Sequence, residues 1–172
     1  MPKLITHQQK LEDCGAAVAE FLDQASPLGD KLAVLLVQLP PKLALDEAVA
    51  AAFFEDLTSR TDAAIACEPR HVSWFTRQAD ALLDRLSVAR VAADPAICQA
   101  AAAPGGSVQL EYWRLHGSPV MYRSSYRDRI DHLASKLKAG AAADAWCIFD
   151  NTASSAATAD ALELMQKLGI DG

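Results

Sequence analysis

The sequence lacks any run of lysine and arginine, which argues against a broad surface for binding nucleic acid. Its 16 basic residues are outnumbered by 22 acidic ones, so the formal net charge is −6. Long hydrophobic runs are also missing, since the longest apolar stretch, Leu32–Leu39, is far shorter than the about 20 residues of a membrane-spanning helix. The segment Met1–Lys3 leads into polar sequence rather than a signal peptide. We therefore expect a cytoplasmic protein with no nucleic-acid partner and no membrane partner.

Cysteine is scarce, with four residues at Cys14, Cys67, Cys98 and Cys147. No two of them have the short spacing that a zinc ribbon or a dithiol redox motif requires. Cys67 and Cys147 lie in apolar segments, which predicts that they are buried, reduced packing residues. A glycine-rich nucleotide-binding motif is absent too, so the sequence indicates no particular cofactor.

Short apolar segments alternate with helical patterns along the chain, as is typical of a parallel sheet covered by helices. Hydrophobic residues make up 51% of the sequence, which is enough for the core of a single α/β domain over residues 1–172. Strands are expected at Ala33–Gln38, Ala64–Glu68, Val88–Ala93, Tyr112–His116 and Ala145–Phe149. Helices are expected at Gln9–Gln24, Asp46–Ser59, Phe75–Leu86, Tyr126–Ala139 and Ser154–Leu168. Between the third and fourth strands, we expect at most one short helix and then a flexible turn at 104–106.

The segment Tyr112–Gly117 places a cation and an imidazole two residues apart at the end of an expected strand. Because residues two apart on a strand share a face, Arg114 and His116 are expected to point the same way. Glu68 and Arg70 repeat this arrangement after the second strand. The pattern predicts a functional site. The alternative is a structural ion-pair network among Glu68, Arg70 and Arg114, because buried charges are costly unless they are paired.

Together these segments resemble the YecE-like family, also known as domain of unknown function 72, over nearly the whole chain. The matching residues are Ile5–His7, Leu28–Leu32, Gln38–Pro41, Glu68, Arg70–His71, Ser73–Trp74, Asp94, Arg114–Gly117, Tyr122, Tyr126 and Asp150–Thr152. The resemblance implies a TIM-barrel-like fold of parallel strands and helices, in a family whose biochemical activity is not established. It also implies further strands before Ile5–His7, so we expect an incomplete barrel of about five strands. Either the start codon is assigned too late or the chain is a truncated variant.

The active site of a parallel barrel lies at the carboxyl ends of its strands, where polar residues therefore carry extra weight. Every expected strand ends in such residues, which are Gln38, then Glu68 with Arg70 and His71, then Asp94, then Arg114 with His116, then Asp150 with Asn151. Each also has a local interpretation. Gln38 can cap a turn, Asp94 can form an Asx-turn, and Asn151 can stand at the start of the last helix.

The residue types indicate roles at this edge of the sheet. Arg70 and Arg114 can hold an anionic group, because a guanidinium presents a planar fork that matches carboxylate or phosphate. His116 is the acid/base candidate, and Glu68 can act as a base or orient Arg114. The predicted catalytic residues are Glu68, Asp94 and His116. The predicted substrate-binding residues are Gln38, Arg70, His71, Arg114, Tyr122, Tyr126 and Asn151.

Tyr122 and Tyr126 lie in the loop after the Arg-Leu-His-Gly segment and are expected to form a lid over a bound anion. The alternative is that Tyr126 packs in the first turn of the next helix. A divalent metal held by His71, Glu68, Asp94 and His116 is a further alternative. No local spacing supports that metal, and no metal site is predicted.

Two functions stay open at the level of the sequence. The first is a barrel enzyme that acts on a small anionic substrate by acid/base or hydrolytic chemistry. The second is a non-catalytic truncated remnant or binding module. Missing strands would leave Ala33–Gln38 and Ala145–Phe149 as unprotected sheet edges, which predicts self-association through those edges. The helix at Gln9–Gln24 would cover one edge in part.

Overall fold

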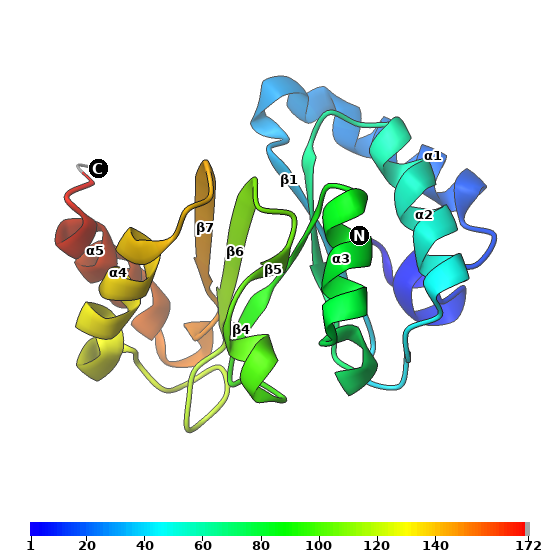
Figure 1. Ribbon diagram of the computed structural model, residues 1–172. Helices are drawn as coiled ribbons and strands as arrows, with labels where there is room; N and C mark the ends of the chain where they lie inside the picture. The colour runs from blue at the N-terminus through cyan, green and yellow to red at the C-terminus, as the bar shows by residue number, and fades with distance from the viewer. Residues whose placement is uncertain (171–172) are drawn as a thin grey trace.

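The computed structural model describes residues 1–170, in which parallel strands are flanked by helices (Figure 1). Two sheets are present, with the strand orders β1-β2-β3-β5 and β4-β6-β7. The strands are β1 (Val34–Gln38), β2 (Ala64–Glu68), β3 (Val88–Arg90), β4 (Ala92–Asp94), β5 (Gly105–Gly106), β6 (Leu110–Leu115) and β7 (Asp144–Phe149). The α-helices are α1 (Gly15–Ala25), α2 (Glu47–Ser59), α3 (Arg77–Arg85), α4 (Ile130–Ala139) and α5 (Ala156–Leu168). Short helical turns are η1 (Leu4–Gln8), η2 (Ser26–Lys31), η3 (Val72–Trp74), η4 (Gln99–Ala102), η5 (Arg127–Arg129) and η6 (Thr152–Ser154).

The strands pair in parallel in the order in which they occur along the chain. β1 pairs with β2 and β2 with β3, while β4 pairs with β6 and β6 with β7. Only Val91 separates β3 from β4, so a single stretch of chain belongs to both sheets. Gln38 is level with Glu68 at the end of the first pair, and Leu115 is level with both Asp94 and Phe149. The carboxyl ends of the parallel strands therefore lie along one edge of the fold.

The structure confirms a mixed α/β fold but shows no closed barrel, so the expected TIM-barrel-like arrangement is not confirmed. The number of strands was also predicted wrongly, since the described residues form seven strands rather than five. The expected strand at Val88–Ala93 is divided between the two sheets. Gly105–Gly106, expected as a flexible turn, pairs antiparallel with β3. Gly106 has φ +64°, and a Cβ there would lie 2.4 Å from the carbonyl oxygen of Val88, so the close pairing requires glycine.

Capping side chains and backbone torsions set where the helices begin. The carboxylate of Asp46 accepts hydrogen bonds from the amides of Ala48 at 3.0 Å and Val49 at 3.1 Å, which fixes the start of α2 as expected. The helix expected at Gln9–Gln24 begins only at Gly15. Lys10 and Leu11, with positive φ values of 53° and 74°, do not have helical torsions.

Helices cover one face of each sheet, with α1, α2 and α3 beside β1, β2 and β3, and α4 and α5 beside β7 (Figure 1). The opposite face is apolar but only partly covered, and it includes Tyr112, while Trp146 on β7 is 40% exposed. Arg114 and His116 follow Tyr112 on this second face. In residues 1–170, no helix is long and apolar enough to cross a membrane. The expected cytoplasmic location stays a prediction.

Candidate functional site

A group of charged and polar side chains meets at the carboxyl ends of β1, β2, β6 and β7. We call this group the Glu68 cluster, and its members are Gln38, Glu68, Arg70, Arg114, His116 and Asp150. Alternation along each strand brings them together, because residues level with one another on neighbouring parallel strands share a face. Gln38 is level with Glu68, and Ile148, two residues before Asp150, is level with Arg114.

Glu68 lies at the centre of the cluster and is 1% exposed. Its Oε1 accepts a hydrogen bond from Arg70 Nη2 at 2.6 Å, and its Oε2 accepts one from Arg114 Nη1. Burial raises the pKa of Glu68, but the hydrogen bond with His116 and the charges of the two arginines outweigh burial and lower the pKa overall. Glu68 is therefore held as a carboxylate.

Arg114, at the end of β6, connects to the other three strand ends of the cluster. Besides Glu68, its guanidinium donates to Gln38 Oε1 at 3.0 Å and forms an ion pair with Asp150. Burial lowers the pKa of Arg114, whereas Glu68 and Asp150 raise it, and the carboxylates have the larger combined effect. The Arg114 side chain is 14% exposed and that of Asp150 is 23% exposed, so this part of the cluster reaches the surface.

His116 is 1% exposed and has charged groups on both sides of its ring. Its Nε2 lies 2.9 Å from Arg70 Nη2 and 3.0 Å from Glu68 Oε1, and its Nδ1 lies 3.1 Å from Asp150 Oδ2. A proton on Nε2 is donated to Glu68. With the proton on Nδ1, facing Asp150, Nε2 can instead accept from Arg70. The surroundings therefore accommodate the proton on either ring nitrogen, as a group that transfers protons requires.

The cluster leaves some of its own polar atoms unpaired. Among residues 1–170, Arg70 Nε, Arg114 Nε and His116 Nδ1 are buried without a hydrogen bond of good geometry. The 3.1 Å approach of Nδ1 to Asp150 is thus an electrostatic contact rather than a well-formed hydrogen bond. Unpaired buried donors cost stability.

Tyr122 lies beside the cluster, whereas Tyr126 does not. The Tyr122 amide donates to the carbonyl of His116, and the two rings are edge-to-face with centroids 6.0 Å apart. Tyr126 is fully buried, and its hydroxyl accepts from the Gly117 amide at 2.8 Å and donates to the Asp94 carbonyl at 3.0 Å. Burial is the main reason that the pKa of Tyr126 is raised to about 12. The structure thus places Tyr122 beside the cluster and buries Tyr126 in the fold, and the lid stays a prediction.

Asp94 and His71 lie outside the cluster. Asp94 is level with Leu115, so it faces away from Arg114 and His116, and its carboxylate pairs with Arg129 at 2.6 Å. His71 Nδ1 lies 2.9 Å from the Ser73 hydroxyl, at the start of a short helical turn. The metal set of His71, Glu68, Asp94 and His116 is therefore not assembled. Residues 1–170 contain no group of three or more such side chains that could hold a metal ion.

Asn151, predicted to bind substrate, also lies outside the cluster, and its neighbour Asp150 is the cluster member at the end of β7. Asn151 is fully buried, and its Nδ2 donates to the Ser124 carbonyl at 3.0 Å and to Asp160 Oδ2 at 2.6 Å. The strand register identifies Asp150 as the member of the cluster. Asp150 is two residues after Ile148, which shares a face with Arg114.

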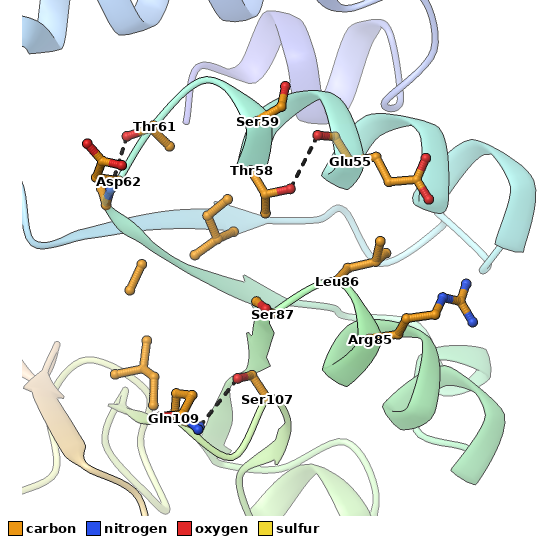
Figure 2. A pocket seen from close by; sticks show the side chains of 14 residues that line it. Glu55, Thr58, Ser59, Thr61, Asp62, Arg85, Leu86, Ser87, Ser107 and Gln109 are labelled. Carbon is orange, nitrogen blue, oxygen red and sulfur yellow. Dashed lines mark hydrogen bonds between the residues drawn. The ribbon is translucent and has the colours of Figure 1, made fainter.

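A pocket with a volume of about 720 Å³ lies at the opposite, amino-terminal ends of β2, β3 and β6, so none of the Glu68 cluster lines it (Figure 2). Some of its polar side chains form hydrogen bonds to backbone groups a few residues away in the sequence. Thr58 donates to the Phe54 carbonyl at 2.7 Å, and Ser107 accepts from the Gln109 amide at 3.3 Å.

The family model described as "Protein of unknown function DUF72" matches residues 1–172. No curated protein matches the chain. A DUF72 family protein from Thermotoga maritima is similar in structure, with a TM-score of 0.81 and 18% identity over 98% of this chain and 71% of its own. One structure of a DUF72 family protein from Enterococcus faecalis has a TM-score of 0.75 and 20% identity over 92% of this chain and 67% of its own. A second structure of it has a TM-score of 0.72 and 22% identity over 90% and 68%.

Proposed function

The chain belongs to the DUF72 family of proteins of unknown function, as its sequence predicted, and we propose that its Glu68 cluster is an active site that binds a small anion. The reaction is of the acid/base or hydrolytic type, and His116 transfers the proton. The observation that carries the proposal is the position of the His116 ring, with Glu68 and Arg70 at Nε2 and Asp150 at Nδ1.

Glu68 acts as a positioning residue in this proposal. Its lowered pKa makes it a poor proton acceptor near neutral pH, so it is better suited to orient His116 than to act as the base itself. Because Glu68 also holds Arg70 and Arg114, one carboxylate fixes the imidazole and both cations in a single arrangement. Such fixed groups lower the reorganisation that a reaction requires.

The anion binds on the outer side of Arg70 and Arg114, whose side chains are 17% and 14% exposed. Asp150 is the most exposed charged partner of Arg114, so it is the carboxylate that a bound anion displaces or joins most easily. A guanidinium has five donor hydrogens in a planar fork and accommodates a carboxylate or phosphate alongside its existing partner.

The second candidate is a non-catalytic binding module in which the cluster is a structural ion-pair network. One observation favours it. The two guanidinium groups of the cluster are already balanced by the two carboxylates of Glu68 and Asp150. Against it, buried ion pairs can often be replaced by apolar residues without loss of stability, so stability alone gives little reason to keep them.

A thermal-shift titration tests anion binding. Inorganic phosphate, acetate and glycolate are added in turn, and at about a hundredfold excess over Kd a bound anion should raise the melting temperature by about 5–10 °C. Arg70→Ala and Arg114→Ala should each abolish the rise. Arg127→Ala is the matched control, because that arginine is 79% exposed and lies outside the cluster. No rise with any anion, or a rise that survives in both cluster variants, contradicts the proposal.

The TIM-barrel-like architecture expected from the sequence belongs to the same proposal. It is supported by the parallel pairing of strands in chain order and by the gathering of charged groups at their carboxyl ends. The chain spans 67–71% of the length of its solved relatives, which leaves room in those relatives for further strands.

A further inference from the structure

Exposed apolar side chains are present on each of the loops that follow β2, β4 and β6. They are Val72 (60% exposed), Ile97 (44%), Val120 (54%), Met121 (42%) and Tyr122 (49%). Because β2 pairs with β3, which continues into β4, and β4 pairs with β6, these three loops leave neighbouring strand ends. The Glu68 cluster lies at the same ends. Charged groups at the strand ends are thus accompanied by an apolar border on the loops.

Tyr122 is the member of this border that is fixed beside the cluster. Its backbone has φ +63°, an unfavourable value for a bulky residue. The amide of Tyr122 donates to the His116 carbonyl, and its own carbonyl accepts from the Ala153 amide at 3.0 Å. Its ring is nearly perpendicular to the ring of His116, at an interplanar angle of 85°. Strained backbone that is held in place by hydrogen bonds is typical of functional sites.

From this geometry we propose that the anion bound at the Glu68 cluster is an organic acid or phosphate ester with an aromatic or similarly flat apolar substituent. Tyr122 is its specificity-determining residue. The charged group of the ligand binds Arg70 and Arg114, and the apolar substituent covers the exposed Tyr122 ring. An inorganic anion or a sugar phosphate would leave the Tyr122 ring in water, whereas an aryl group buries part of it. The inference rests on the proposed function, since it requires an anion at the cluster.

The test compares two pairs of ligands that differ only in the aryl group. The pairs are inorganic phosphate with phenyl phosphate, and acetate with phenylacetate, each titrated calorimetrically. The aryl member of each pair should bind about tenfold more tightly, as expected from one aromatic contact and the apolar area that it buries. Both pairs are used because the cluster chemistry accepts either charged group.

Tyr122→Asn is the informative variant, since asparagine tolerates a positive φ and lacks the ring. It should reduce the aryl advantage, measured as the ratio of the two affinities within each pair, to less than about threefold. Val108→Asn is the control, because Val108 is 70% exposed and lies before β6, at the far end of the strands. Equal affinities within each pair, or an aryl advantage that survives in Tyr122→Asn, overturn this inference and leave the proposed anion site standing. Binding of none of the four ligands overturns both.

Discussion

At the scale of single residues, Glu68 links the charge of the cluster to the stability of the protein. Its folded-state pKa lies below the ordinary value of 4.5, so on acidification the unfolded chain takes up this proton before the folded one does. The stability that Glu68 contributes is therefore complete above about pH 5. It is lost as the pH falls from about 4.5 through the lower folded-state pKa.

Replacing Glu68 by glutamine should remove this part of the pH dependence. We expect Glu68→Gln to lower the free energy of unfolding at pH 7 by about 3–5 kcal/mol, because two partly buried arginines lose their anionic partner. Between pH 5 and pH 3 the variant should lose less stability than the wild type. Urea denaturation across this pH range measures both effects, with Glu20→Gln on the exposed side of α1 as control. Parallel pH profiles for wild type and Glu68→Gln would rule out the role of this carboxylate.

Much of the cluster could be predicted from the sequence. The two-residue spacing placed Arg114 with His116, and Glu68 with Arg70, because alternation along a strand is set by covalent geometry. The choice between Asp150 and Asn151 depended on strand register, which the sequence does not state and which assigns the two residues to opposite faces.

The long-range contacts of the other predicted residues could not be read from a local pattern. Asp94 pairs with Arg129, which lies 35 positions away in the sequence. Tyr126 follows Gly117 by nine positions and binds its amide, a contact that depends on how the intervening loop folds back. The expectation that polar residues at strand ends lie together predicts the position of the backbone. It does not predict which side chain, distant in the sequence, will contact each of those residues.

At the scale of elements, α5 anchors the loop that carries Tyr122. The carboxylate of Asp160 on α5 is 2% exposed. It accepts hydrogen bonds from Ser125 Oγ at 2.6 Å, the Tyr126 amide at 2.8 Å and Asn151 Nδ2 at 2.6 Å. One buried side chain thus ties the end of this loop and the segment after β7 to the same helix.

Removing that carboxylate should loosen both segments together. We expect Asp160→Ala to destabilise the protein by about 3 kcal/mol, because several buried donors lose a charged acceptor at once. Amide hydrogen exchange should become faster at Tyr122 and Tyr126. Glu163→Ala on the same helix is the control, since its contact with Arg127 is long, at 3.9 Å. Equal stability of the two variants would show that Asp160 does not anchor the loop.

Element types were easier to predict than element boundaries and pairings. Strands such as β1, β2 and β7 match the expected segments to within one residue, because continuous apolar runs are typical of the strands of a parallel sheet. The start of α1 was predicted too early. In the absence of a proline or glycine between positions 9 and 14, no local signal marked the positive φ values there. The division of one strand between two sheets depends on long-range pairing, and so it has no local signal at all.

At the scale of the whole molecule, the two outermost parallel strands are β1 and β7, as expected from the sequence. Within residues 1–170, each has a strand partner on one side only. The amino group of Met1 donates to the Leu36 carbonyl at 2.8 Å and so occupies one point along β1. On β7, Asp144, Ala145 and Trp146 are exposed. The apolar face that these strands share is partly open as well.

The 172-residue chain, purified on its own, should therefore self-associate by pairing of these edges or by burial of the open apolar face. Neither strand has the lysine or internal proline that protects a free edge, and such edges recruit further strands. Light scattering after size exclusion should show an average mass that rises with concentration over a hundredfold dilution series. Trp146→Lys adds a charge to β7 and should shift the population toward monomer. Leu162→Lys should not, because Leu162, although 61% exposed, lies on α5 away from both edges. Exposed edges carry unpaired amide and carbonyl groups, which favour association. A wild-type chain that stays monomeric at every concentration would therefore contradict the prediction and show that the edges of β1 and β7 are protected within one chain.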